Sequence, residues 1–308
     1  PPLDDIDHLL ALDPGGRGLT RYLAPGAALA AARALRPARR VLLVTGFCVP
    51  PGVPETDGPP GTAVLGRALR TLGAEVRYLT ERSVRDTLAA ALAALGEPTG
   101  VEVWEEGGPA RTGRVRPTHL VAIERPGRAR TGDYLSARGE SIAAWNAPLD
   151  TLFLEASGAV TVGVGDGGNE IGMGNLRPRL ARHDPALARI ASVVRVRHLV
   201  VAGTSNWGAY GVVAALSRLT GRPLLHSAED ERRLIQACAK AGAVDGITRR
   251  AEPTVDGLPL EVHAGFVALL GRAALAPATR RGRAGIIGGE GVGFAVAPRR
   301  RAGGRARV

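Results

Sequence analysis

Lysine is nearly absent from this chain of 308 residues, since Lys240 is the only one among 40 basic residues. Aromatic side chains make up 4% of the sequence, so the core has to be built mainly from Val, Leu, Ile and Ala. No window reaches the roughly 20 consecutive apolar residues of a membrane span. The first residues also lack the charged and then apolar pattern of a secretory signal. We therefore expect a soluble protein that stays inside the cell.

Cysteine is also scarce, and Cys48 and Cys238 are far apart, with none of the close spacing that metal-binding cysteines show. Two unpaired thiols are typical of a reducing compartment. We therefore expect a cytoplasmic protein without disulfides.

The net charge of +11 raises the question of nucleic-acid binding, because clustered cations gain affinity from phosphate groups. The arginines are scattered, however, and no helix face combines them with interleaved aromatic residues. Only the two ends resemble basic arms, around Arg36–Arg40 and over residues 299–308. We expect solvated surface charge, a disordered basic tail at 299–308, and no primary role in nucleic-acid binding.

Short β-rich runs alternate with helical stretches that are rich in Ala and Leu. Strands are predicted at Val41–Val44, Glu75–Leu79, Val101–Trp104, His119–Ile123, Val160–Val164 and His198–Ala202. Helices are predicted at Ala63–Leu72, Val84–Leu95, Leu149–Ala156, Pro185–Val194, Trp207–Leu219, Glu229–Ala241 and Val262–Leu275. This alternation predicts a doubly wound α/β fold with a mostly parallel sheet and helices on both faces, in three α/β/α layers. We expect residues 1–298 to form one domain.

Four segments that follow predicted strands are longer or chemically richer than ordinary connections. They are Thr45–Gly61, Glu124–Asn146, Gly165–Asn175 and Gly203–Trp207. The loops after parallel strands leave from the same edge of the sheet, where ligands of open α/β folds bind. The sequence therefore predicts that these four loops converge on one site.

The first loop is rich in proline and carries two acids, Glu55 and Asp57. A rigid loop lowers the entropic cost of holding a carboxylate in position, which suits a catalytic role. A solvent-exposed, proline-rich cover is the structural alternative.

The glycine-rich loop Gly165–Asn175 contains Asp166, Asn169, Glu170 and Asn175. Glycines allow close backbone approach to a ligand, and two acids four residues apart are candidates for binding a hard cation or for acting as a base. A dinucleotide fingerprint is not met, because acids stand where phosphate would lie. A tight turn without a ligand also remains open.

The remaining loops supply groups that could bind a carboxylate-bearing substrate. Arg125 and Arg138 present the planar fork that matches a carboxylate, and Glu124 is either a site residue or the structural partner of Arg125. Ser205 and Asn206 are predicted to form a helix N-cap, and the same amides could polarise a carboxyl oxygen.

At these loops the sequence resembles the D-glutamate cyclase C-terminal domain family. The matching stretches are VLLVTGFCVPPGVPETDGPPGTAVLGRAL, HLVAIERPGRARTGDYLSARGE, TVGVGDGGNEIGMGN and HLVVAGTSNWGAYGVVAAL, with weaker matches in GAVDGI and TVDGLPLEVH. The resemblance implies a lyase of the hydro-lyase type, which closes D-glutamate to 5-oxo-D-proline with loss of water.

Roles for the candidate residues follow from that chemistry as hypotheses. Glu55 or Asp57 would take the proton of the ammonium, and Arg125 and Arg138 would bind carboxylates. Asp166 and Glu170 would hold a divalent cation, Mn²⁺ or Mg²⁺, or protonate the leaving oxygen. The glycine-loop amides and Asn206 would stabilise the oxyanion.

Two other functions use the same convergent loops. One is metal-assisted phosphoryl or nucleotide chemistry, and the other is a non-catalytic domain that binds an amino acid. We expect a small-molecule substrate, no organic cofactor and no membrane partner. The sequence leaves a homo-oligomer open.

Overall fold

The computed structural model describes residues 3–105 and 116–275. These residues belong to one compact unit, which spans Pro1–Ala276. The predicted basic tail at 299–308 and the end of the predicted domain, 277–298, lie outside the described residues.

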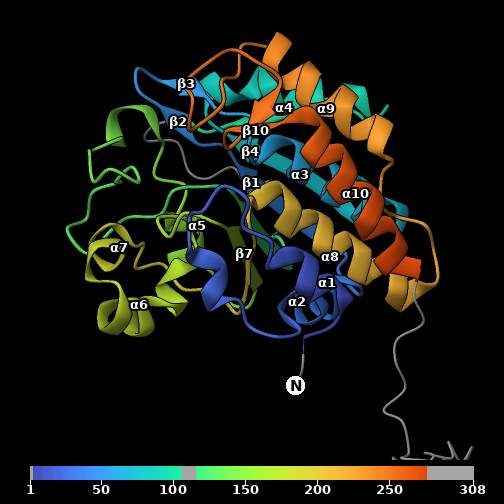
Figure 1. Ribbon diagram of the computed structural model, residues 1–308, viewed down its shortest axis with the longest axis horizontal. Coiled ribbons are helices and arrows are strands. Elements are labelled where there is room, and N and C mark those ends of the chain that lie inside the picture. Colours follow the sequence, from blue (N-terminus) through green and yellow to red (C-terminus); the bar gives the residue numbers. More distant parts are fainter. Residues whose placement is uncertain (1–2, 106–115, 276–308) are drawn as a thin grey trace, which may run out of the picture. The chain divides into compact units, whose positions relative to one another are not determined.

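Six parallel strands form the central sheet (Figure 1). In spatial order they are β5 (Glu102–Val103), β4 (Glu75–Thr80), β1 (Arg40–Thr45), β6 (His119–Ile123), β7 (Val160–Gly165) and β8 (His198–Val201). Counted along the chain, this is the order 3-2-1-4-5-6 of doubly wound folds, with its switch point between β1 and β6. The pairings between neighbouring strands of this sheet are parallel, where the sequence predicted a mostly parallel sheet.

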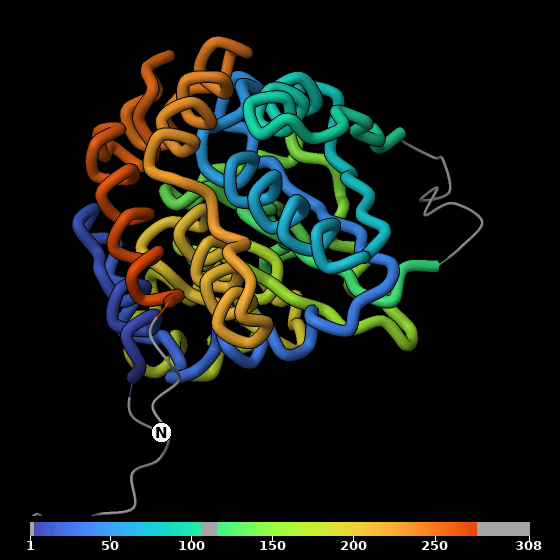
Figure 2. Tube along the Cα trace, turned by 90° about the vertical axis from the view of Figure 1, so that its right-hand side faces the viewer, coloured from blue at the N-terminus to red at the C-terminus, as the bar shows by residue number. Residues whose placement is uncertain are grey.

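Both faces of the central strands are buried, which explains their nearly continuous apolar runs. One face packs against a thick layer of helices. These are α1 (Asp5–Leu10), α2 (Ala27–Leu35), α3 (Pro59–Thr71), α4 (Arg82–Ala94), α8 (Ser205–Thr220), α9 (Ala228–Lys240) and α10 (Leu260–Leu275). This layer is turned toward the viewer in Figure 2.

The other face is covered by shorter elements, and together the layers give the expected three-layer α/β/α arrangement. The shorter elements are α5 (Thr151–Leu154), α6 (Arg177–His183), α7 (Pro185–Ile190) and the single turns η1 (Leu19–Tyr22), η2 (Ala143–Trp145) and η3 (Met173–Asn175). In Figure 1, α5, α6 and α7 lie on the opposite side of β7 from α8.

Several element boundaries differ from the sequence-based prediction. The helix predicted at Leu149–Ala156 is reduced to α5, and the one at Pro185–Val194 ends at Ile190. Beyond Ile190 the backbone bonds to other loops: the amide of Ser192 donates to Gly168, and that of Val193 donates to Arg128. The strand at Val101–Trp104 keeps two residues, whereas α1, α2 and α6 were not predicted.

Two small hairpins stand apart from the central sheet. One is β2 (Cys48–Val49) with β3 (Val53–Pro54), inside the first long loop, and the other is β9 (Thr254–Val255) with β10 (Leu258–Pro259). Among the residues that the structure describes, no helix combines the length and apolar character needed to span a membrane.

Candidate active site

The loops that follow β1, β6, β7 and β8 meet at the carboxyl edge of the sheet. Asp57, in the first loop, accepts hydrogen bonds of 2.8 Å from the backbone amides of both Ser205 and Asn206. Ser205 Oγ in turn donates a 2.5 Å bond to Glu124 Oε2. The convergence predicted from strand ends is therefore confirmed.

Six carboxylates gather at this point, and all are nearly excluded from water. Their residues are Glu55, Asp57, Glu124, Asp166, Glu170 and Asp256, with exposures between 0% and 7%. The guanidinium of Arg17 reaches into the same space and pairs with two of them, Asp166 and Asp256. Such an excess of buried negative charge requires protons or a cation to offset it.

Glu55 and Glu124 form a pair of neighbouring buried carboxyl groups, close enough for each to act on the pKa of the other. Burial raises the pKa of both groups well above the usual value, and neighbouring carboxylates raise it further: Asp256 and Asp57 act on Glu55, and Glu170 acts on Glu124. A carboxyl pair with raised pKa values can accept and return a proton near neutral pH.

Asp57 lies at the amino end of α8. Besides the two amides of α8, its Oδ1 accepts a bond of 3.1 Å from the amide of Gly58. Burial raises the pKa of Asp57, and these amide donors oppose that shift. The N-cap of α8 is Thr204, whose side chain accepts from the amide of Trp207, so the predicted cap at Ser205 and Asn206 is wrong. The amides of Ser205 and Asn206 serve the Asp57 carboxylate instead.

Asn206 also ties the first loop to α8 through its side chain. Its Oδ1 accepts from the amides of Gly58 (3.0 Å) and Gly61 (2.8 Å), and its Nδ2 donates to the carbonyl of Thr56. The structure therefore uses this side chain to shape the loop that carries Glu55 and Asp57.

The glycine-rich loop folds around Glu170. Both oxygens of this carboxylate accept from the loop's own amides, those of Asp166, Gly167 and Gly168. Asn169 donates to the carbonyl of Leu135. These bonds shape the loop so that the carboxylate of Asp166 joins the acidic cluster.

Asn175 lies outside this cluster. Its side chain donates a 2.8 Å bond to the carbonyl of Val196 and accepts a 3.2 Å bond from the amide of the same residue. The structure therefore gives Asn175 a structural role in joining two loops.

Asp166 and Asp256 share Arg17. The Nη1 atom of Arg17 lies 2.9 Å from Oδ2 of Asp166 and 2.8 Å from Oδ1 of Asp256. The second oxygen of each aspartate is buried and has no hydrogen-bond partner. Burial raises the pKa of Asp166, although the charge of Arg17 acts in the opposite direction.

Arg125, which the sequence offered as a carboxylate ligand, is fully buried and bound to the protein. Its Nη1 donates to the carbonyl of Gly46 at 2.8 Å and pairs with Glu81, and its Nη2 donates to the carbonyl of Ala147 at 2.5 Å. Burial raises the pKa of Glu81, and Arg125 opposes that shift. Both terminal nitrogens are occupied, which favours a structural role for this arginine.

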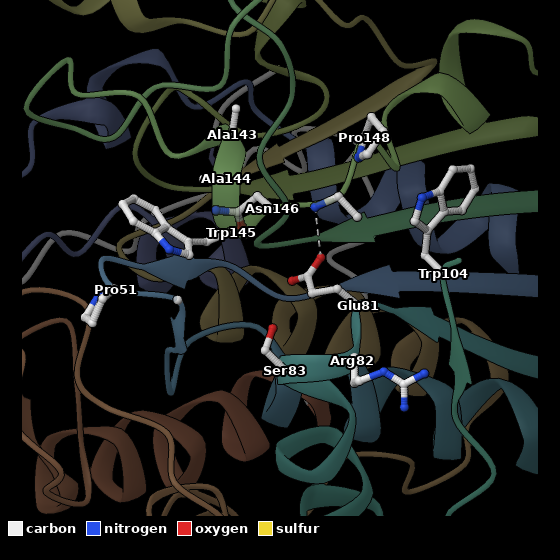
Figure 3. Close-up of a pocket in the computed structure, with 12 residues that line it drawn as sticks. Pro51, Glu81, Arg82, Ser83, Trp104, Ala143, Ala144, Trp145, Asn146 and Pro148 are labelled. Carbon is white, nitrogen blue, oxygen red and sulfur yellow. Dashed lines mark hydrogen bonds between the residues drawn. The ribbon is translucent and has the colours of Figure 1, made fainter. Parts of the chain in front are cut away.

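A cavity of about 670 Å³ lies on the β4–β5 side of this ion pair (Figure 3). Glu81 and Ser83 contribute polar groups to its lining, and the indoles of Trp104 and Trp145 lie on opposite sides of Glu81. The cavity thus adjoins the acidic cluster across the Arg125–Glu81 pair.

Two arginines lie near the Glu55 end of the cluster. Arg249 is close enough to Glu55, Arg138 and Glu140 for their charges to act on it, and burial lowers the pKa of Arg249. Its Nη1 atom is buried and has no hydrogen-bond partner. Arg138 is exposed. A substrate carboxylate could therefore be bound by these two side chains.

Sequence reasoning missed Arg17, Asp256, Arg249 and Glu81. Asp256 lies in the TVDG turn and Arg249 follows the GAVDGI stretch, and both stretches resemble the family only weakly. A bridge between Glu55 and Val244 places this region beside the first loop. The carboxylate of Asp245 joins its two turns by accepting from the amides of Ile247, Thr248 and Gly257.

The acidic cluster contains two groups of three carboxylates whose ligand atoms lie within 4.8 Å of one another. One group is Asp57, Asp166 and Asp256, and the other is Glu124, Asp166 and Glu170. Carboxylate oxygens are the ligands that Mg²⁺ and Mn²⁺ prefer. The geometry is thus capable of holding a metal ion, as the sequence predicted for Asp166 and Glu170.

Comparison with known proteins places this site in context. The family model described as D-glutamate cyclase-like, C-terminal, matches residues 6–271. Over 239 residues the chain is 37% identical to the human protein named "D-glutamate cyclase, mitochondrial". That match covers 69% of this chain and 38% of the human protein, so the chain spans about two fifths of that relative's length.

Similarity to solved structures is distant. An exopolyphosphatase-related protein from Bacteroides fragilis aligns with a TM-score of 0.41 and 9% identity, over 82% of this chain and 58% of that chain. RecJ from Thermus thermophilus, solved in complex with Mn²⁺, aligns with a TM-score of 0.33 and 16% identity, over 89% of this chain and 39% of that chain. Both TM-scores are too low to infer a shared fold or a shared chemistry from these alignments.

Proposed function

The chain belongs to the D-glutamate cyclase-like C-terminal family, and on that premise we propose that it closes D-glutamate to 5-oxo-D-proline with loss of water. The observation that carries the proposal is the cluster of six buried carboxylates with Arg17, in which burial raises the pKa of the neighbouring Glu55 and Glu124. The human relative supports the substrate by its name alone, since the chain corresponds to only part of that protein.

The chemistry needs proton carriers more than it needs a nucleophile from the protein. The substrate's own α-amine attacks its γ-carboxyl carbon, and such an intramolecular attack has a high effective concentration. The ammonium loses two protons as it becomes the lactam N–H, and the departing oxygen gains two as it leaves as water. No proton is gained or lost in total, so the site has only to move protons between these two atoms.

The Glu55–Glu124 pair suits that transfer. In the proposal, Glu55 accepts the first proton from the ammonium, which frees the nitrogen lone pair for attack. The pair then gives this proton to the departing oxygen. The second proton, which the nitrogen loses after the attack, follows the same path, so that two protons leave the nitrogen and two reach the oxygen that departs as water. Because burial raises the pKa of both groups, neither is locked in its charged form.

Asp57 is the second candidate for the base. Its three amide donors and its place at the amino end of α8 favour the charged form. We therefore assign proton transfer first to Glu55, and to Asp57 a charged role beside the reacting carboxyl group.

The substrate also carries an α-carboxylate, which needs a positively charged partner. We assign this contact to Arg249 and Arg138, because Arg249 has a buried Nη1 without a partner and lies beside Glu55. Arg125 is left out, because its terminal nitrogens are already bound.

A divalent cation, Mn²⁺ or Mg²⁺, would supply Lewis-acid polarisation of the γ-carboxyl group when bound at the acidic cluster. Asp166 belongs to both groups of carboxylates that could hold it. We propose no organic cofactor, and a cytoplasmic setting in which the buried Cys48 and Cys238 stay reduced.

The test is direct. Purified protein is incubated with D-glutamate, with and without Mn²⁺ or Mg²⁺, and 5-oxoproline is followed by chiral chromatography beside L-glutamate and a chelated sample. Product from the D-isomer alone supports the proposal. No product from folded protein with either metal would overturn it.

One observation favours a second candidate, metal-assisted nucleotide chemistry. The cavity with Trp104 and Trp145 lies at the ends of β4 and β5, the part of a doubly wound sheet where a nucleoside is often bound. A thermal-shift screen decides between the candidates: stabilisation by nucleotides but not by D-glutamate or 5-oxoproline would favour the second. Binding of an amino acid or lactam without turnover would favour a non-catalytic domain.

A further inference from the structure

We propose that Asp57, Asp166 and Asp256 form the site of one divalent cation, and that Arg17 positions two of these ligands from the far side. This inference deepens the proposed function, because that proposal invokes a cation and leaves its full ligand set open. It replaces Glu170, the partner that the sequence suggested for Asp166, with two carboxylates from other loops.

The first observation is that two buried carboxylate oxygens in the cluster have no hydrogen-bond partner. Asp166 and Asp256 each use one oxygen to accept a bond from Arg17, at 2.9 Å and 2.8 Å. The other oxygens, Oδ1 of Asp166 and Oδ2 of Asp256, have no partner although their side chains are only 0% and 5% exposed. A buried carboxylate oxygen without a partner is costly, so two of them in one cluster indicate a ligand that satisfies both.

The second observation is the distance between the three carboxylates. One oxygen each from Asp57, Asp166 and Asp256 can be chosen so that all lie within 4.8 Å of one another. Oxygens that bind one cation at 2.0–2.6 Å cannot be farther apart than about 5 Å. The three groups therefore meet the spacing of a common metal ion without any movement of the backbone.

Charge gives a third argument. The three aspartates outnumber the positive charge of Arg17, and Glu124 and Glu170 lie in the same cluster, so a bound cation offsets buried negative charge that would otherwise cost free energy. Ligand sets made only of oxygen select hard ions such as Mg²⁺ and Mn²⁺.

Glu170 is less suited to be a ligand. Its oxygens already accept three amide hydrogens from its own loop, at 3.1, 2.5 and 2.7 Å. The structure uses its charge to hold the glycine-rich turn, which in turn presents Asp166.

Arg17 resembles the outer-shell groups that orient metal ligands. Its own loop is fixed by Asp13, whose carboxylate accepts from the amides of Arg17 at 3.0 Å and Gly18 at 2.6 Å. The guanidinium is therefore delivered by a structured turn. Loss of such an outer-shell partner typically weakens metal affinity by about 10- to 100-fold.

The experiment is a titration of the full chain, freed of metal by chelation, with Mn²⁺ alone. Free Mn²⁺ is followed by its electron paramagnetic resonance signal, and heat of binding by calorimetry. Variants are D256N, which removes a ligand charge, and R17M, which removes the orienting group. The matched control is R128M, because Arg128 also pairs with a fully buried aspartate, Asp150, and is exposed to a similar extent as Arg17. Circular dichroism and melting curves check folding, and R17M carries the test if D256N does not fold.

We expect the wild-type chain to bind one Mn²⁺. The dissociation constant for Mn²⁺ should rise at least about 10-fold in D256N and in R17M, and should change by no more than about twofold in R128M. Wild-type protein without saturable Mn²⁺ binding would overturn the site, as would D256N with wild-type affinity. Tighter binding in R17M would overturn the positioning role, because Arg17 would then compete with the cation. Mn²⁺ binding without lactam formation would leave the site standing and remove only the proposed cyclase activity.

Discussion

Gly246 lies directly against the carboxylate of Glu55. A Cβ atom at position 246 would come within 2.0 Å of Glu55 Oε2, which is closer than non-bonded atoms can approach. The contact is possible because Val244 bridges the backbone of Glu55, so the chain passes the acid at this point. A segment nearly 200 residues away in the sequence thereby sets where the carboxyl group of Glu55 lies.

Replacing Gly246 with alanine should displace the carboxyl group of Glu55 from its place beside Glu124 and Asp57. We expect kcat for lactam formation to fall at least about 100-fold, because a misplaced proton carrier is costly. The matched control is G265A, since a Cβ at Gly265 in α10 meets nothing within 4 Å. Wild-type activity in G246A would contradict the role given to Glu55.

The D57N variant removes the negative charge at the amino end of α8. We expect turnover to be lost, with the fold intact but a lower melting temperature, because three amide donors lose a charged acceptor. Chiral product analysis and melting curves measure the two effects. Full activity in folded D57N would rule out any catalytic role for this carboxylate.

Arg249 is assigned to the substrate's α-carboxylate. In R249M we expect KM for D-glutamate to rise about 10- to 100-fold while kcat changes less, because ground-state binding is lost. The exposed Arg138 should show a smaller increase in R138M. Arg130 is exposed on the same loop and provides the control R130M. A fall in kcat alone would indicate a different role for Arg249.

The acidic cluster should make stability depend on pH. Because burial raises the pKa of Glu55 and Glu124 above the ordinary value of 4.5, the folded chain holds protons that the unfolded chain has lost. Their contribution to stability is complete below that ordinary value and is lost as pH rises through the raised pKa values. We expect the melting temperature of metal-free protein to fall as pH rises above the ordinary carboxyl value of 4.5.

Other groups titrate in that range, so the comparison is with a double variant, E55Q/E124Q. The fall should be smaller in the double variant, and Mn²⁺ should restore more stability to wild-type protein at the higher pH. An equal pH dependence in both proteins would show that this pair is not its source.

The Arg125–Glu81 pair should matter for folding. In R125M a buried carboxylate and two carbonyls lose their partner. Removing one partner of a buried ion pair typically costs about 3–5 kcal/mol. Urea unfolding measures the loss of free energy. A loss below about 1 kcal/mol would instead suit a surface-like pair and reopen a substrate-binding role for Arg125.

The sequence by itself determined the fold class and the place of the site. Apolar strands alternating with helices allow little but a parallel α/β sheet, and loops after parallel strands must share one edge. Glu124 and Asp166 could be found in this way because each directly follows a strand of the sheet, and Glu55 and Asp57 because they are the two acids of the long loop after the first strand.

Tertiary structure alone decided which of these groups are free to act. Arg125 follows its strand almost as closely as Glu124 does, and Asn175 lies in the same loop as Asp166, but packing directs both to internal partners. Arg17 comes from a turn before the first strand of the sheet, and Asp256 comes from a late hairpin. Nothing in the sequence fixes where either segment lies relative to the edge of the sheet. Their meeting at Asp166 depends on long-range contacts, which periodicity and local spacing do not encode.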